Sequence, residues 1–201
     1  MIAIIDYDAG NLRSVEKALQ LLGQETIITR ERNIIDQADK VILPGVGAFK
    51  EAMEKLENYQ LTDVVKEAAF SGKPFLGICL GLQLLFEESE EGEGVRGLGV
   101  LKGRIVRIPK AEGLKVPHIG WNSLNVKEGA RLFKGIGENP YVYFVHSYYL
   151  KAENRDDVAA VTDYGVTMDT SVEHGNIFAC QFHPEKSGDT GLHILKNFAA
   201  L

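Results

Sequence analysis

The first eighty residues alternate between short apolar runs and longer stretches in which apolar residues recur every three or four positions. Short apolar runs are typical of buried strands, and the wider spacing is typical of amphipathic helices. The expected strands are 2–7, 26–29, 40–43 and 74–78, and the expected helices are 11–22, 48–57, 61–70 and one that starts at Leu80 and continues to Phe86. This alternation predicts a parallel sheet with right-handed crossovers, flanked by helices.

From Val100 onward the pattern changes to short alternating strands separated by turn glycines. A closing amphipathic helix begins at Asp189. The sequence therefore predicts an α/β fold in which a mixed or antiparallel extension adjoins a mostly parallel central sheet. Neither a repeat nor a linker divides the 201 residues, so we expect one domain over 1–201. The strands expected in the second half are 100–108, 122–126, 141–149, 158–162, 166–172 and 177–182.

Composition and charge narrow the range of partners. The chain has 28 acidic and 22 basic side chains, and its net charge of −6 argues against binding to the phosphate backbone of nucleic acid. The N-terminus enters an apolar run without a basic segment, and no apolar stretch approaches the ~18 residues of a membrane span. We therefore expect a cytoplasmic protein that contacts no membrane. The two cysteines are too few for a disulfide framework, and no ligand spacing suggests a metal or another cofactor.

Two charged stretches have ordinary explanations. The acidic run 87–94 follows the helix that starts at Leu80, and a solvated surface loop explains it better than a metal site does. The basic residues fit a solvated strand edge, with a partner-facing patch as the alternative. These basic residues are Lys102, Arg104, Arg107, Lys110 and Lys115.

The change from strand to helix at Cys79 is the first candidate for chemistry. Gly77 and Gly81 lie two positions before and two positions after this cysteine, a spacing typical of a nucleophile elbow. Glycine is needed on both sides because a β-carbon there would crowd the adjacent strand or helix. The N-terminus of the following helix would stabilise a thiolate. Taken alone, the five-residue pattern fits a buried cysteine at a strand end equally well.

His183-Pro184-Glu185 supplies the partners that a reactive cysteine needs. These residues end an alternating strand in a proline-stiffened turn, so an imidazole base and an orienting carboxylate lie close together. The same alternation places Cys180 on the opposite face from His183, which indicates that Cys180 is a buried core thiol. Cys79 is therefore the expected nucleophile of a Cys/His/carboxylate triad.

Residues 77–83 (Gly-Ile-Cys-Leu-Gly-Leu-Gln), together with His183-Pro184-Glu185, resemble the triad-type, class I glutamine amidotransferases. Further motifs are similar to those of the glutaminase subunits of imidazole glycerol phosphate synthases, and the resemblance covers essentially the whole chain. It implies the fold of that class, a flavodoxin-like or α/β-hydrolase-like mostly parallel sheet. The further motifs are 6–14, 44–47, 116–122, 143–149 and 186–187.

The resemblance also implies roles for individual residues. Cys79 would attack the side-chain amide of L-glutamine, and His183 and Glu185 would manage the proton. It places Gln83 against bound glutamine, with Ser147 and Tyr148 around the α-carboxylate. Backbone N–H groups of Leu80, Val46 and Gly47 are the expected oxyanion donors. The family pattern usually has a second glycine where Val46 stands, so the oxyanion hole is not necessarily preformed.

The implied activity is hydrolysis of glutamine to glutamate and ammonia, without a cofactor. Ammonia would pass through a channel to a separate (β/α)8 cyclase subunit in a heterodimer, which makes imidazole glycerol phosphate and an aminoimidazole ribonucleotide in histidine biosynthesis. The alternatives are the amidotransferase component of another synthase, such as anthranilate or aminodeoxychorismate synthase, and a noncatalytic scaffold. The motifs at 120–122 and 143–149 argue against another synthase, and the complete triad argues against the scaffold.

Overall fold

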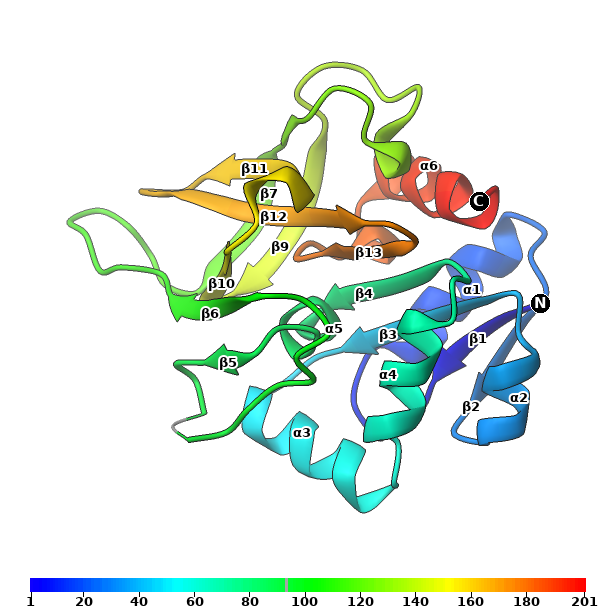
Figure 1. Ribbon diagram of the computed structural model, residues 1–201. Coiled ribbons are helices and arrows are strands. Elements are labelled where there is room, and N and C mark those ends of the chain that lie inside the picture. The colour runs from blue at the N-terminus through cyan, green and yellow to red at the C-terminus, as the bar shows by residue number, and fades with distance from the viewer. Residues whose placement is uncertain (93) are drawn as a thin grey trace.

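A twisted central sheet forms the middle of the molecule (Figure 1). The structure is a computed structural model that describes residues 1–92 and 94–201. Eleven strands of this described part form the sheet, and nine of them follow the order β2-β1-β3-β4-β13-β12-β10-β6-β5. The first five in that order are parallel, which confirms the parallel sheet expected from the sequence. They are β2 (Thr26–Thr29), β1 (Ile2–Ile5), β3 (Lys40–Gly45), β4 (Phe75–Cys79) and β13 (Ile177–Cys180).

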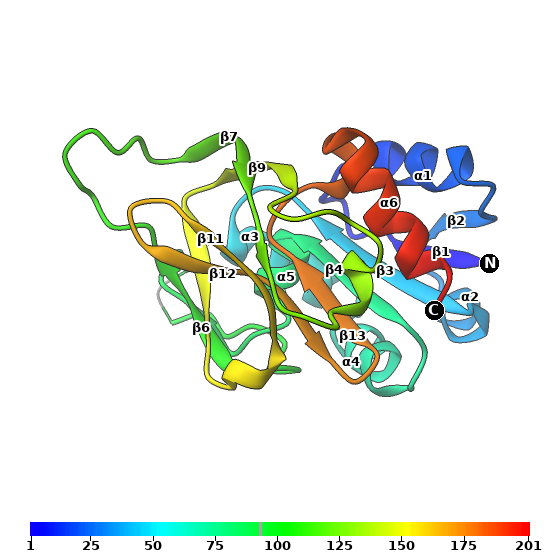
Figure 2. The same cartoon turned by 90° about the horizontal axis from the view of Figure 1, so that it is seen from above.

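Helices cover both faces of this parallel half. Successive residues of a strand point to opposite faces, so Ile5 of β1 packs in one core and Ile4 in the other. Helices α2, α3 and α4 pack in the core that contains Ile5. Helices α1 and α6 pack in the opposite core, where they lie together in Figure 2. The bounds are α1 (Leu12–Leu21), α2 (Arg32–Gln37), α3 (Phe49–Asn58), α4 (Thr62–Phe70), α5 (Leu80–Leu84) and α6 (Gly188–Ala199).

The rest of the sheet is a mixed extension, as predicted, in which most pairs are antiparallel and β5 pairs with β6 in parallel. Strand β13 pairs with β12, and the pairs β12–β10 and β10–β6 follow. Strand β11 pairs with β12 and also with β8, away from this path. The additional strands are β5 (Glu88–Ser89), β6 (Gly103–Arg107), β8 (Asn125–Val126), β10 (Tyr148–Ala152), β11 (Val158–Asp163) and β12 (Thr167–His174).

The prediction of one continuous strand over 141–149 is wrong. The chain breaks at Ser147 into β9 (Tyr141–His146) and β10, because the two segments join different sheets. Strand β9 pairs with β7 (His118–Ser123) in a separate two-stranded sheet, whereas β10 continues in the central sheet. Ser147 therefore lies where the chain changes from one sheet to the other.

Smaller differences also separate the structure from the expectations. The strand expected at 122–126 is two strands, β7 and β8, and β7 begins four residues earlier, at His118. The helix expected to reach Phe86 is regular only over Leu80–Leu84. Helix α2 was not predicted, because its six residues are too few to show a helical period. Within the described residues, no helix combines the length and apolarity needed to cross a bilayer.

Candidate active site

Cys79 occupies a strained position between β4 and α5. Its backbone has φ 56° and ψ −109°, a conformation that residues other than glycine rarely adopt. A β-carbon on Gly81 would come within 1.9 Å of the Leu43 carbonyl oxygen, and one on Gly77 within 2.9 Å of the Gly81 oxygen. Both glycines are therefore needed for the tight turn. This geometry agrees with the predicted nucleophile elbow.

The end of β13 brings His183 and Glu185 toward Cys79. Strand β13 runs parallel to β4, with Cys180 opposite Ile78, so both strands end at the same edge of the sheet. His183 Nδ1 and Glu185 Oε1 lie 2.8 Å apart, and both side chains are 1% exposed. Ser187 fixes the turn, because its hydroxyl donates to the His183 carbonyl and accepts from the Tyr143 N–H. Orientation of the imidazole by a carboxylate is the arrangement expected of a triad.

Opposing effects set the charge of His183. Burial alone would lower its pKa, but interactions with Cys79 and Glu185 outweigh burial and raise the pKa to about 9. No formed hydrogen bond joins His183 Nε2 to an atom of the described residues, and Glu185 Oε2 is also without such a partner. We infer attraction between the imidazolium and the sulfur rather than a completed hydrogen bond, since apo sites often have loose catalytic contacts. The imidazole therefore carries its second proton at neutral pH.

Cys180 is a core residue, as predicted. Its side chain is fully buried, and its thiol donates to the Phe182 carbonyl over 3.5 Å. Burial raises the pKa of this thiol well above its ordinary value. Cys180 is therefore held as a neutral thiol, which is a poor nucleophile.

The segment expected to form the oxyanion hole lies beside the elbow. In the parallel pairing of β3 with β4, Gly45 lies opposite Cys79. Val46 and Gly47 line the same cavity as Cys79 and Leu80, and Gly47 has φ +102°. The Tyr7 hydroxyl donates to the Pro44 carbonyl over 2.8 Å from a fully buried position. One end of the segment is thus fixed, whereas the Val46 side chain is 42% exposed.

The three residues expected to contact glutamine line this cavity, whose volume is about 160 Å³. Gln83 is buried, and its amide donates to the Tyr148 carbonyl over 3.1 Å. Ser147 and Tyr148 form another part of the wall, at the break between the two sheets. The structure thus brings together all nine residues singled out from the sequence, eight of them in the cavity wall and Glu185 through its contact with His183. The other wall residues are Glu91, Val145 and His146.

Gln181 and Glu91 were missed from the sequence. The Gln181 amide lies 3.7 Å from Cys79 Sγ as a donor, and its oxygen accepts from Gln83 over 2.9 Å. Strand alternation places Gln181 on the same face as His183, which was the available signal. Glu91 lines the cavity and accepts the Phe49 N–H at the start of α3. Nothing in an acidic run distinguishes one glutamate that turns inward.

The charged stretches are exposed at most positions, as expected of solvated surface. Glu87, Glu88 and Glu90 are exposed, but Glu91 is only half-exposed, and Glu93 lies outside the described residues. All five basic side chains between Lys102 and Lys115 are exposed, but the expected strand edge is wrong, because β6 pairs on both sides and only Arg104 and Arg107 belong to it. Among the described residues, no group of three or more His, Cys, Asp or Glu side chains is arranged to hold a metal ion.

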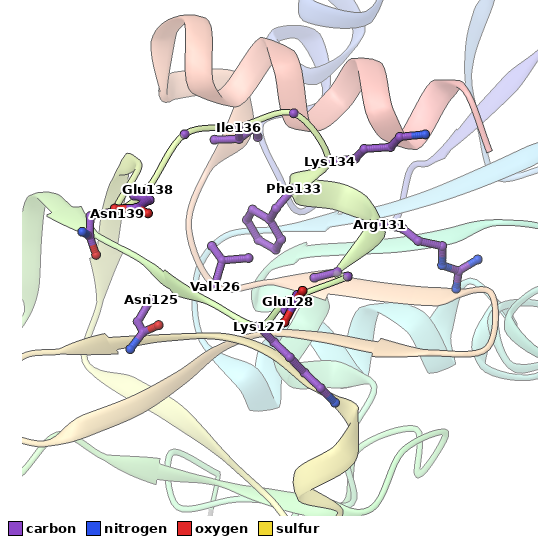
Figure 3. Close-up of a pocket in the computed structure, with 14 residues that line it drawn as sticks. Asn125, Val126, Lys127, Glu128, Arg131, Phe133, Lys134, Ile136, Glu138 and Asn139 are labelled. Atoms are coloured by element: carbon purple, nitrogen blue, oxygen red, sulfur yellow. The ribbon is translucent and has the colours of Figure 1, made fainter.

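A larger hollow lies away from the triad. It has a volume of about 740 Å³, and residues between Asn125 and Asn139 line it, with Phe133 and Val126 in its middle (Figure 3). Two of its charged side chains serve local structure, since Lys127 donates to the Asp156 carbonyl and Arg131 pairs with Glu173. The smaller cavity is the better candidate for an active site, because Cys79 and His183 both line it and Glu185 pairs with His183.

Comparisons with known proteins agree on a family. The family model for glutamine amidotransferase class-I matches residues 3–201. A protein of Caldanaerobacter subterraneus subsp. tengcongensis is 51% identical over 201 residues, which are 100% of this chain and 98% of that protein. One of Methanothermobacter thermautotrophicus is 52% identical over 201 residues, with the same coverage. Both are named imidazole glycerol phosphate synthase subunit HisH.

Solved structures share the fold. A crystal structure of a glutamine amidotransferase has a TM-score of 0.76 at 23% identity, and the match covers 99% of this chain and 100% of that one. The structure of PurLQS from Thermotoga maritima has a TM-score of 0.75 at 22% identity, with coverage of 99% and 97%. At these identities the likeness concerns the fold alone. It agrees with the α/β architecture expected from the sequence.

Proposed function

Since the chain belongs to the class I glutamine amidotransferases, and within them to the imidazole glycerol phosphate synthase subunit HisH family, we propose that it hydrolyses glutamine and supplies ammonia to a synthase partner. The observation that carries this proposal is one cavity in which Cys79 on an elbow meets the buried pair His183 and Glu185. The pathway would be histidine biosynthesis.

The chemistry follows from the charge state of His183. Cys79 attacks the amide carbon of glutamine as a thiolate, and the carbonyl oxygen becomes an oxyanion that backbone N–H groups of Leu80 and the Val46–Gly47 segment stabilise. Because the pKa of His183 is raised to about 9, its imidazolium holds a proton to give to the departing nitrogen. Ammonia leaves and a thioester remains. His183 then takes a proton from water, and the resulting hydroxide attacks the thioester carbon. The C–S bond breaks, which restores the Cys79 thiolate and releases glutamate, whose new carboxyl proton passes to solvent.

The walls of the cavity suggest how glutamine is held. The Gln83 side-chain oxygen and the Ser147–Tyr148 main chain would contact the glutamine backbone, and Glu91 offers a carboxylate for the α-ammonium group. Glu91 also accepts the N–H of Phe49 at the start of α3. A bound ammonium group would therefore share this carboxylate with the helix that follows the oxyanion segment.

The surface beside the cavity favours a protein partner. Ile119 and Trp121 on β7 are 60% and 54% exposed, and Val46 at the cavity wall is also exposed. Ile119 and Trp121 are two positions apart on one strand and so share a face, and adjoining exposed apolar side chains are typical of interaction sites. We propose that a (β/α)8 cyclase subunit covers this side in a heterodimer and receives the ammonia through a channel. The amidotransferase component of another synthase is the alternative, and the names of the relatives reported above do not favour it.

Replacement of each cysteine tests the assignment of the nucleophile. Cys79→Ala should abolish glutamate release, with a loss of several orders of magnitude, while the fold and use of added ammonium by the complex remain. Cys180→Ala is the matched control and should retain activity, because this thiol is neutral and faces the core. Glutamate is measured with the cyclase subunit present. Substantial glutamine turnover by Cys79→Ala would overturn the proposal.

A further inference from the structure

Two buried histidines outside the triad contact one another beside the cavity. His118 of β7 and His146 of β9 lie opposite each other in the two-stranded sheet, and both are at most 6% exposed. His118 Nδ1 and His146 Nε2 are 3.0 Å apart. The His118 ring is stacked on Tyr164 at 3.9 Å and on Phe144 at 4.8 Å. These contacts fix the rings in place, yet the triad chemistry uses neither of them.

Hydrogen-bond partners determine which nitrogen carries each proton. His146 Nδ1 is 2.8 Å from the Tyr148 carbonyl oxygen, which can only accept, so Nδ1 carries the hydrogen. Burial lowers the pKa of both histidines to about 4, so both rings are neutral at neutral pH. His146 Nε2 is therefore an acceptor, and His118 Nδ1 must donate to it. Donation thus proceeds in one direction, from His118 through His146 to Tyr148.

The Tyr148 carbonyl is an anchor with two donors. It accepts from His146 on one side and from the Gln83 amide over 3.1 Å on the other. Gln83 also donates to Gln181, whose own amide donates to Cys79 Sγ over 3.7 Å. A chain of hydrogen bonds therefore joins the histidine pair to Cys79, and it runs through the Tyr148 carbonyl oxygen, Gln83 and Gln181. Both lone pairs of that oxygen are occupied, which restrains rotation of the Tyr148 backbone.

The direction of the backbone at Ser147 and Tyr148 determines which main-chain groups face the cavity. The Ser147 carbonyl accepts from the Ile108 N–H over 2.9 Å, so it points toward the end of β6. In a trans peptide the next N–H, that of Tyr148, points the opposite way. It therefore lies on the same side as the Tyr148 carbonyl, where Gln83 and the cavity are. A donor N–H on this wall suits a carboxylate.

We propose that His118 and His146 are positioning residues for the glutamine carboxylate, which they serve by holding the Tyr148 carbonyl and thereby the backbone of Tyr148, whose N–H faces the cavity. This inference rests on the proposed glutaminase function. His146 holds the carbonyl, and His118 keeps His146 in the Nδ1–H form, which free imidazole adopts less readily than the Nε2–H form. Ladder pairing with β7 ends at His146. Beyond it, β6 holds one side of the backbone through the Ser147 carbonyl, and His146 and Gln83 hold the other side through the Tyr148 carbonyl.

A matched pair of substitutions at His146 tests the anchor. His146→Leu removes the donor to Tyr148, whereas His146→Asn has the same shape as leucine and places an amide N–H where Nδ1 stood. Both are assayed for glutamine hydrolysis with the cyclase subunit present. His146→Leu should raise KM for glutamine about five- to tenfold with kcat changed by less than about twofold, because the lost hydrogen bond serves binding. His146→Asn should recover most of that loss.

The tautomer provides a readout independent of activity. In ¹⁵N-labelled wild-type protein, ring nitrogen spectra should show His146 with hydrogen on Nδ1, and His118→Phe, which keeps an aromatic ring in the stack, should shift His146 toward the Nε2–H form. Hydrogen on Nε2 of His146 in the wild type would overturn the inference. An equal rise of KM in the Leu and Asn variants, or no rise in either, would do the same. Absence of glutamine turnover in the wild-type complex would instead overturn the proposed function, and the tautomer result would still stand.

Discussion

At His183 the environment acts on the pKa in opposite directions. Burial favours the neutral ring, while Cys79 and Glu185 favour the charged ring, and the charges prevail. The consequence is that His183 is a protonated acid at neutral pH. The site therefore resembles an ion pair formed before the substrate binds more than a site with a neutral imidazole. Proton transfer from His183 to the departing nitrogen needs no prior uptake of a proton from water.

A raised pKa predicts a dependence of stability on pH. Since the pKa of His183 is raised from 6.5 to about 9, its contribution to the free energy of unfolding is fully present below pH 6.5 and is lost as pH rises through about 9. Urea denaturation of wild type and His183→Asn between pH 6 and 10 measures this contribution. The stability advantage of the wild type should shrink with rising pH. A difference that grows with pH would contradict the assignment.

The members of the triad should contribute unequally to turnover. His183→Ala removes both acid and base and should reduce kcat by roughly 10⁴-fold or more, and Glu185→Ala should cost roughly one to two orders of magnitude less. Glu185→Gln is the matched variant, because it keeps an acceptor near Nδ1 and removes the charge. Glutamate release in the presence of the partner is the measurement. If His183→Ala keeps more than about a tenth of the wild-type rate, another group activates the sulfur.

Among the elements, residues 44–47 at the end of β3 are expected to form the oxyanion hole, and one end of this oxyanion segment is fixed whereas the other is free. Tyr7 holds the Pro44 carbonyl, and Gly45 has no room for a side chain, because a β-carbon there would approach the Tyr7 hydroxyl within 2.5 Å. Val46 follows with an exposed side chain, and Gly47 has a positive φ. A change of conformation in this segment is therefore confined to the peptides around Val46.

Substitution of Val46 should reveal whether this segment controls turnover. A β-branched residue restricts the backbone, so Val46→Gly should raise basal glutamine hydrolysis of the isolated chain and reduce stimulation by the cyclase subunit with its ligand. Val46→Pro removes the N–H and should abolish stimulation, at the ~10²–10³-fold cost of one oxyanion donor. Glutamine turnover is compared with and without the partner. Stimulation of Val46→Pro equal to that of the wild type would show that this N–H is not the donor.

Local sequence signals predicted the elements better than their connections. The elbow at Cys79 and the turn at 183–185 have short-range glycine and proline signals, so their positions were predicted from the sequence. The break at Ser147 was missed, because it depends on β9 and β10 joining different sheets, and no local pattern records that pairing. Glu91 and the contact between His118 and His146 were missed for the same reason. They arise from packing between segments distant in sequence.

At the scale of the whole molecule, the candidate site lies where two architectures meet. The parallel half supplies Cys79 at the end of β4, and β13, where antiparallel pairing starts, supplies the turn with His183. The change of sheet at Ser147 supplies the wall opposite the nucleophile. Exposed Ile119 and Trp121 belong to the two-stranded sheet that also carries His146. A partner seated on this sheet would therefore be close to the wall of the cavity that His146 helps to form.

Transfer of labelled nitrogen tests the central claim most directly. The complex with the cyclase subunit is given glutamine labelled with ¹⁵N in its side-chain amide, together with unlabelled ammonium in excess, and the imidazole product is analysed by mass spectrometry. The wild type should place ¹⁵N in the product despite the excess, and Cys79→Ala should form only unlabelled product. Label in the product of Cys79→Ala, or wild-type product with no more ¹⁵N than the surrounding ammonium, would contradict the account.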